Sequence, residues 1–240
     1  MSGGAGRAPC RLVFDFGRVV FRWEPAELLR RQLPRHAHDD ASAAHWVEQV
    51  FQSYGGDWGD YDRGVLTPPA LAQRMAARTG LGVAEARRVI DAVPDALQPL
   101  PASVAWLQRL RDAGQPFYFL SNMPAPVAET LRAHHAFMGW FTDGVFSCHV
   151  GHNKPEPAIY EIAARRFGHP VAELVFMDDH GPNVDAARAL GWRALQFHDA
   201  VQAEAEARAL GWTPQDGPDR GGPPAPTVRG PCAPGRFPPP

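Results

Sequence analysis

A short stretch near the amino terminus, Leu12–Val20, constrains the fold more than any other part of the chain. Its first apolar run ends in Asp15, and Gly17 separates it from a second apolar run. An uninterrupted apolar run of this kind is typical of a parallel strand that is buried on both faces. A carboxylate at the end of such a strand lies at the carboxyl edge of the sheet, where open α/β folds bind ligands. Glycine at position 17 predicts a sharp turn there.

Four later apolar runs repeat this pattern and indicate a sheet of five strands. Helical periodicity fills the chain between the later strands and after the last one. Strands that alternate with helices form parallel sheets with right-handed crossovers. The sequence therefore predicts an α/β fold with a Rossmann-like core, in which helices cover both faces of the sheet. The expected strands are 11–15, 117–120, 145–147, 174–177 and 193–197.

The block after the first strand, residues 25–98, has only helical periodicity. Apolar residues recur at three- and four-residue steps in segments 26–33, 41–54, 68–79 and 83–93. We therefore predict a small helical bundle inserted after the first strand. The predicted domains are a core of residues 1–24 and 99–212, a helical insertion of residues 25–98, and a tail of residues 213–240.

Composition excludes several classes of function. A net charge of -2 provides no long-range attraction to nucleic acid or anionic membranes. The three cysteines are far apart and lack metal-ligand spacing, which favours a reducing compartment. No segment has the length of a secretion signal or a membrane span, so we expect a cytoplasmic protein, and no protein partner is evident. Ten of the 25 prolines fall in residues 213–240, which predicts a disordered tail.

Polar residues follow four of the apolar segments or lie in the loops beside them. Because the carboxyl ends of parallel strands meet at one edge of a sheet, we expect these side chains to converge. Carboxylates held together repel one another and need a cation, and hard oxygen ligands favour Mg²⁺. A carboxylate beside a metal ion and an ammonium group stays ionised and can act as a nucleophile. The converging residues are Asp15, Ser121, Asn122, Lys154, Asp178 and Asp179.

Lys154 is the only lysine, although the chain has 24 lysine and arginine residues in total. A chain that uses arginine wherever a general cation is needed retains one compact ammonium group. Such a group, together with Mg²⁺, neutralises charge on a phosphoryl group during its transfer. The set fits phosphoryl transfer through an aspartyl-phosphate.

Four motifs in this order resemble those of the haloacid dehalogenase-like superfamily, and the resemblance covers about residues 11–212. The insertion lies where that family places its type-one cap. Its segment Tyr61–Thr67 is similar to a cap segment of sugar-phosphate phosphatases and of the phosphatase domain of epoxide hydrolases. The motifs are Phe14-Asp15-Phe16-Gly17, Leu120-Ser121-Asn122, Lys154-Pro155 and Met177-Asp178-Asp179.

The resemblance implies a Mg²⁺-dependent phosphatase that acts on a small phosphorylated metabolite, such as a sugar phosphate. It assigns the role of nucleophile to Asp15 and implies that Lys154 orients both Asp15 and the phosphate. It also assigns phosphate binding to Ser121 and Asn122. The implied metal ligands are Asp15, Asp179, the backbone carbonyl of Gly17, and Asp178 as a second ligand or close support.

One departure from the family pattern concerns the general acid. Many phosphatases of the family have a second aspartate two residues after the nucleophile, where this chain has Gly17. Leaving-group protonation then needs water, a cap residue or a substrate hydroxyl. Two alternatives stay open: a 2-haloacid dehalogenase, in which Asp15 attacks carbon, and a catalytically weak binding or regulatory protein. The dehalogenases typically have tyrosine where Gly17 stands, and paired Asp178-Asp179 argues for metal and phosphate.

Overall fold

The computed structural model describes residues 10–210 and confirms the α/β class. Five parallel strands form one sheet in the order β5-β4-β1-β6-β7. The central strand β1 pairs with β4 on one side and β6 on the other, so the polar groups that follow these strands share one edge. The strands are β1 Arg11–Phe14, β4 Phe117–Ser121, β5 Asp143–Phe146, β6 Leu174–Asp178 and β7 Arg193–Gln196.

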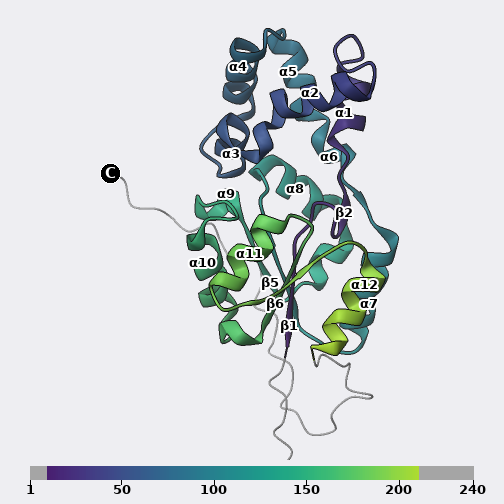
Figure 1. The fold of residues 1–240 in the computed structure, drawn as a ribbon, viewed down its shortest axis with the longest axis vertical. Coiled ribbons are helices and arrows are strands. Elements are labelled where there is room, and N and C mark those ends of the chain that lie inside the picture. The colour runs from purple at the N-terminus through teal and green to yellow at the C-terminus, as the bar shows by residue number, and fades with distance from the viewer. Residues whose placement is uncertain (1–9, 211–240) are drawn as a thin grey trace, which may run out of the picture.

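Helices cover both faces of this sheet, as Figure 1 shows with α7 and α12 on one side and α10 and α11 on the other. Successive residues of β1 alternate between two apolar cores, because side chains of a strand point to opposite faces. Leu12 and Phe14 pack with α7, α8 and α12, whereas Val13 packs with α10 and α11. These helices are α7 Pro101–Asp112, α8 Ala125–His134, α10 Pro157–Phe167, α11 Gly181–Ala189 and α12 Ala200–Ala209.

A helical insertion lies above the carboxyl edge of the sheet (Figure 1). Along the chain, it follows β1 and precedes β4. Local signals set its helix ends: Thr67 caps α4 through the Ala70 N–H, and Gly80 ends that helix with a φ of 78°. The insertion consists of α1 Pro25–Gln32, α2 Asp40–Phe51, η1 Gln52–Tyr54, α3 Gly56–Asp62, α4 Pro68–Thr79, α5 Val83–Asp91 and α6 Val93–Ala96.

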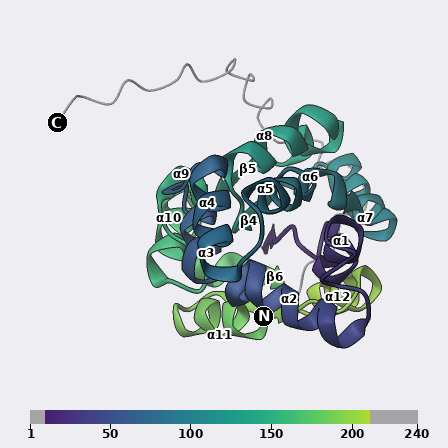
Figure 2. The same ribbon diagram turned by 90° about the horizontal axis from the view of Figure 1, so that it is seen from above.

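The chain enters and leaves this insertion at one place. Strands β2 (Phe21–Arg22) and β3 (Gln98–Pro99) pair antiparallel there, so the two crossing points are held side by side. Seen from above, α3 and α4 lie over α9 (Ser147–Val150) and α10 (Figure 2), and α3 is in contact with α9.

Several local expectations were wrong. The predicted helix over residues 41–54 ends at Phe51, because Gln52, Ser53 and Tyr54 all have left-handed backbone with φ of 52°, 50° and 62°. Ser147, expected as the last residue of a strand, instead begins the short helix α9. The sharp turn expected at Gly17 is present, since the N–H of Val19 donates to the carbonyl of Phe16, and the left-handed residue of this turn is Arg18, with a φ of 57°.

The predicted tail of residues 213–240 lies outside the described residues. Among residues 10–210, every helix is too short or too polar to cross a lipid bilayer.

A substitution at Gly144 in β5 can test how tightly the sheet packs against its aromatic core. A Cβ at this position would lie 2.1–2.3 Å from ring atoms of Phe119. That ring is itself held between Phe16 and Phe146, with centroids 4.8 and 4.6 Å away. We expect Gly144→Ala to lower the free energy of unfolding by about 1–3 kcal/mol, the usual cost of overpacking a core.

Urea denaturation monitored by circular dichroism measures this loss. Gly139→Ala is the matched control, because a Cβ at Gly139 would have no atom within 4 Å. Equal stability losses in the two variants would contradict this account of the sheet.

Candidate active site

A buried ammonium group lies between two carboxylates at the carboxyl edge of the sheet. Lys154 Nζ is 2.7 Å from Asp15 Oδ1 and 2.6 Å from Asp178 Oδ2. The side chains of Lys154 and Asp178 are 2% and 0% exposed, so water screens these charges little. The predicted convergence of these three residues is thus observed in the structure.

Asp15 is placed by the sheet itself. It directly follows β1, and its N–H donates to the carbonyl of Met177 in β6 at 2.9 Å, so its backbone stays in register with the neighbouring strand. Burial raises the pKa of Asp15 to about 7; the charge of Lys154 opposes this, and the charges of Asp178 and Asp179 add to it. At neutral pH, Asp15 is therefore near the midpoint of its titration, and the charges around it decide how much of it is ionised.

Asp178 serves as the anchor for Lys154. Its Oδ1 accepts the His180 N–H at 2.8 Å, and Asn183 Nδ2 donates to its two oxygens at 3.1 and 3.0 Å. With Lys154 on Oδ2, both oxygens are engaged. The part of Asn183, a residue in the first turn of α11, was not predicted from the sequence. The spacing of five residues from Asp178, at the start of a helix after the strand, was the available signal.

Asp179 completes a cluster that fits a divalent cation. One oxygen each from Asp15, Asp178 and Asp179 lie within 4.8 Å of one another. Burial raises the pKa of Asp179 to about 6, and the charge of Asp178 adds to this, while Lys154 and Arg18 oppose it. A cation of the Mg²⁺ type prefers such oxygen ligands and would relieve this repulsion. The buried Asn183 Oδ1 has no hydrogen-bond partner among the described residues, which leaves a further oxygen beside the cluster.

The segment after β4 holds the backbone of Lys154. Asn122 Nδ2 donates to the carbonyl of Lys154 at 3.0 Å, and Asn122 Oδ1 accepts the Lys154 N–H at 2.8 Å. The Asn122 side chain is thus engaged in placing Lys154, and the predicted phosphate contact would have to come from its N–H. Ser121 is buried at the end of β4 on the same edge, and its phosphate-binding role stays a prediction.

A model of the haloacid dehalogenase-like hydrolase family matches residues 24–191. The chain belongs to the haloacid dehalogenase-like hydrolases. The family assignment agrees with the resemblance drawn from the four motifs. The matched span includes β4, β6 and the loop of Lys154, and the first motif, with Asp15, lies before it.

Relatives within this family include enzymes named as phosphatases. The sesquiterpene phosphatase astK of Aspergillus oryzae is 27% identical over 199 residues, which are 82% of this chain and 94% of that protein. The fructose-1-phosphate phosphatase YqaB of Escherichia coli is 30% identical over 104 residues, 42% of this chain and 53% of that protein. A family enzyme of Bacteroides thetaiotaomicron, solved with magnesium and inorganic phosphate, has a TM-score of 0.63 at 19% identity over 78% of this chain and 93% of its own, and it shows the shared fold.

The lysine of this hydrolase can be tested by removing its charge. In Lys154→Met, Asp15 and Asp178 face each other without a cation, and we expect the free energy of unfolding to fall by about 3–5 kcal/mol at pH 8. Burial already raises the pKa of Asp15 to about 7 in the wild type, and protonation of this carboxyl in the folded variant lowers the cost. The loss relative to the wild type should therefore be smaller at pH 5 than at pH 8.

Chemical denaturation of wild type and Lys154→Met at the two pH values, in chelator, measures both effects. Lys154→Arg retains the charge but not the compact shape, so it should be more stable than Lys154→Met. A Lys154→Met loss that does not depend on pH would contradict the account of this buried ion pair.

Proposed function

We propose that this protein is a Mg²⁺-dependent phosphatase that hydrolyses a small phosphorylated metabolite through an aspartyl-phosphate on Asp15. The observation that supports this most is the ammonium group of Lys154 between Asp15 and Asp178, 2.7 and 2.6 Å from their oxygens. An ammonium at this place orients the attacking carboxylate and favours its ionised form, the form that acts as a nucleophile.

Each residue has a role in this scheme. Asp15 attacks phosphorus, and Lys154 holds Asp15 and accepts a phosphate oxygen. Ser121 and the N–H groups that follow β4 bind other phosphate oxygens. Asp15, Asp179 and the carbonyl of Gly17 would hold Mg²⁺, with Asp178 beside them, and the metal ion would neutralise charge on the phosphoryl group.

The helical insertion, residues 25–98, is the proposed cap that selects the substrate. Its helix α3 lies over α9 (Figure 2) and accepts a hydrogen bond from Asn153, the residue before Lys154, so we place this insertion at the border of the space that a leaving group would occupy. The names of the relatives point to two substrate classes, sugar phosphates and sesquiterpene phosphates. A panel with both classes separates them, because a sugar presents hydroxyl groups to the cap and a sesquiterpene presents apolar surface.

The dehalogenase alternative is less well supported. The cluster of Asp15, Asp178 and Asp179 fits a cation. Attack of Asp15 on a carbon–halogen bond does not require a metal ion to neutralise a phosphoryl group, so it does not explain this cluster. Gly17 also stands where those enzymes typically have tyrosine. Chloride release from 2-chloropropionate, measured beside phosphate release, tests this alternative directly.

The proposed mechanism predicts that Asp15→Asn lowers Mg²⁺-dependent phosphate release to the background of the assay. Asparagine retains the shape but cannot attack phosphorus, and loss of a nucleophile removes several orders of magnitude in rate. Phosphate release from a panel of phosphorylated metabolites, with Mg²⁺ and with chelator, measures this. The matched control is Asp112→Asn, an exposed aspartate at the end of α7, which should retain the wild-type rate.

The contrary outcomes are distinct. Chelator-resistant release of chloride by the wild type would support the dehalogenase. Wild-type binding of phosphorylated compounds without any phosphate release would support the regulatory protein. Near-native phosphate release by Asp15→Asn would remove the aspartyl-phosphate from the scheme.

A further inference from the structure

The position that usually provides the general acid is empty in this chain. Gly17 has no side chain, and no atom lies within 4 Å of the place where its Cβ would be. The next residue, Arg18, turns away: its Nε donates to the carbonyl of Trp23 at 3.1 Å, and its guanidinium lies near Glu24. The turn after Asp15 therefore offers no acid, and a proton for the leaving group has to come from another element.

Asp62, the last residue of α3 in the helical insertion, has a buried carboxyl group. It is 4% exposed, and across residues 10–210 its carboxyl takes part in no hydrogen bond. The charges of Arg63 and Lys154 act on this carboxyl, so it lies in the electric field of the ammonium group that holds Asp15. A buried acid normally has hydrogen-bond partners, and one without them invites a functional explanation.

Three contacts fix α3 on the core loops that form the site. Ser147 Oγ donates to the carbonyl of Asp62 at 2.6 Å and accepts the N–H of Met123, the residue after Asn122, at 2.9 Å. Asn153 Nδ2, one residue before Lys154, donates to the carbonyl of Gly59 at 2.8 Å.

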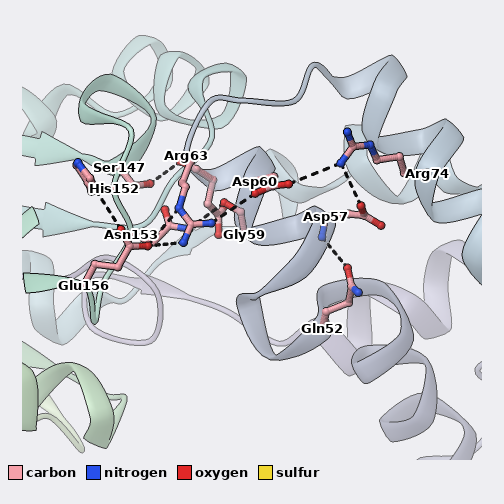
Figure 3. Close-up of polar contacts among 11 residues, drawn as sticks. Gln52, Asp57, Gly59, Asp60, Arg63, Arg74, Ser147, His152, Asn153 and Glu156 are labelled. Carbon is pink, nitrogen blue, oxygen red and sulfur yellow. Dashed lines mark hydrogen bonds and ion pairs between the residues drawn. The ribbon is translucent and has the colours of Figure 1, made fainter. Parts of the chain in front are cut away.

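The third contact is an ion pair. Arg63 Nε donates to Glu156 Oε1 at 3.1 Å, and Figure 3 shows Arg63 and Glu156 beside the Asn153–Gly59 hydrogen bond. These contacts join α3 to the segment after β4 and to the loop of Lys154. The backbone of Asp62 is therefore held in a fixed relation to the residues proposed to bind phosphate.

We propose that Asp62 is the general acid and base of this hydrolase, supplied by the insertion in place of a side chain at position 17. The inference rests on the proposed phosphatase function and names a further catalytic residue for it. As Asp15 forms its bond to phosphorus, the bond between phosphorus and the leaving oxygen breaks, and that oxygen takes the proton of Asp62. In the second step Asp62, now a carboxylate, takes a proton from the water that attacks phosphorus, the bond between Asp15 and phosphorus breaks, and both residues return to their starting states.

The surroundings of Asp62 suit this task. Burial raises its pKa well above the usual range, and the charges of Arg63 and Lys154 oppose this only in part. The other titratable groups near it are Tyr61, Tyr54 and Cys148, whose pKa values the charge of Asp62 helps to raise. None of these three groups has a positive charge that would draw the proton from Asp62, so the acid can enter the reaction protonated.

A comparison of leaving groups tests the proposal. A basic alkoxide needs a proton as it leaves, whereas p-nitrophenolate does not. For Asp62→Asn we expect kcat/KM for an alkyl phosphate to fall about 10²–10⁴-fold, but for p-nitrophenyl phosphate by about tenfold or less. The parameter kcat/KM reports steps up to leaving-group departure, so a slower second step does not obscure the result. Asp60→Asn on the same helix is the control and should retain the wild-type ratio between the two substrates.

Gly17→Asp in the Asp62→Asn background provides the rescue. The space at Gly17 admits a side chain, so the double variant should recover alkyl phosphate hydrolysis by about tenfold or more. A second readout is independent of turnover: because the folded-state pKa of Asp62 is above its unfolded value, Asp62→Asn should gain stability relative to the wild type as pH rises from about 4 to 8. Thermal melts measure this gain.

The experiment distinguishes a failure of the role proposed for Asp62 from a failure of the phosphatase function. Equal losses on both substrates, or no loss on either, would overturn the role of Asp62 and leave the phosphatase intact. A wild type that hydrolyses only p-nitrophenyl phosphate would also overturn it, because no acid then acts. A wild type that hydrolyses neither substrate with Mg²⁺ would refute the phosphatase itself.

Discussion

The buried contact between Lys154 and two aspartates is the constraint on which the rest of this structure depends. A buried ammonium group is stable only when anions surround it closely, and Asp15 and Asp178 do so from neighbouring strands. The strands in turn are apolar on both faces, so the charges can gather only where the strands end. This explains why the buried polar residues of the strands, Ser121 and Asp178, lie at the carboxyl ends of β4 and β6.

The same constraint accounts for the environment of Lys154. Its ammonium group is bound by carboxylates, its backbone is bound by Asn122, and the residue before it is bound to the helical insertion. Burial alone would lower the pKa of Lys154, but the charges and hydrogen bonds of Asp15 and Asp178 outweigh it and raise the pKa. The lysine is therefore charged and fixed over the whole range of pH in which a carboxylate could act as nucleophile.

The sequence predicted those parts of the fold that depend on local chemistry. Apolar runs and their polar ends identified five parallel strands, and the only lysine in the chain pointed to Lys154. Residues whose importance comes from distant contacts were missed. Nothing near Asp62 in the sequence shows that Ser147 and Asn153 hold its helix on the core, and nothing in residues 41–54 shows that Gln52 would turn left-handed. The roles of Ser121 and Asn122 in phosphate binding and the boundaries of the domains stay predictions.

The two-residue pairing of β2 with β3 has a consequence for how such proteins diversify. Phe21 lies opposite Pro99 and Arg22 opposite Gln98, so a segment of more than seventy residues departs and returns through neighbouring points. Insertions whose ends are adjacent place little demand on the host fold. Mutation can therefore lengthen, shorten or exchange this segment while the ion-paired edge below it is inherited unchanged. If Asp62 acts as proposed, α3 cannot be exchanged in this way, because the protein would lose its proton donor.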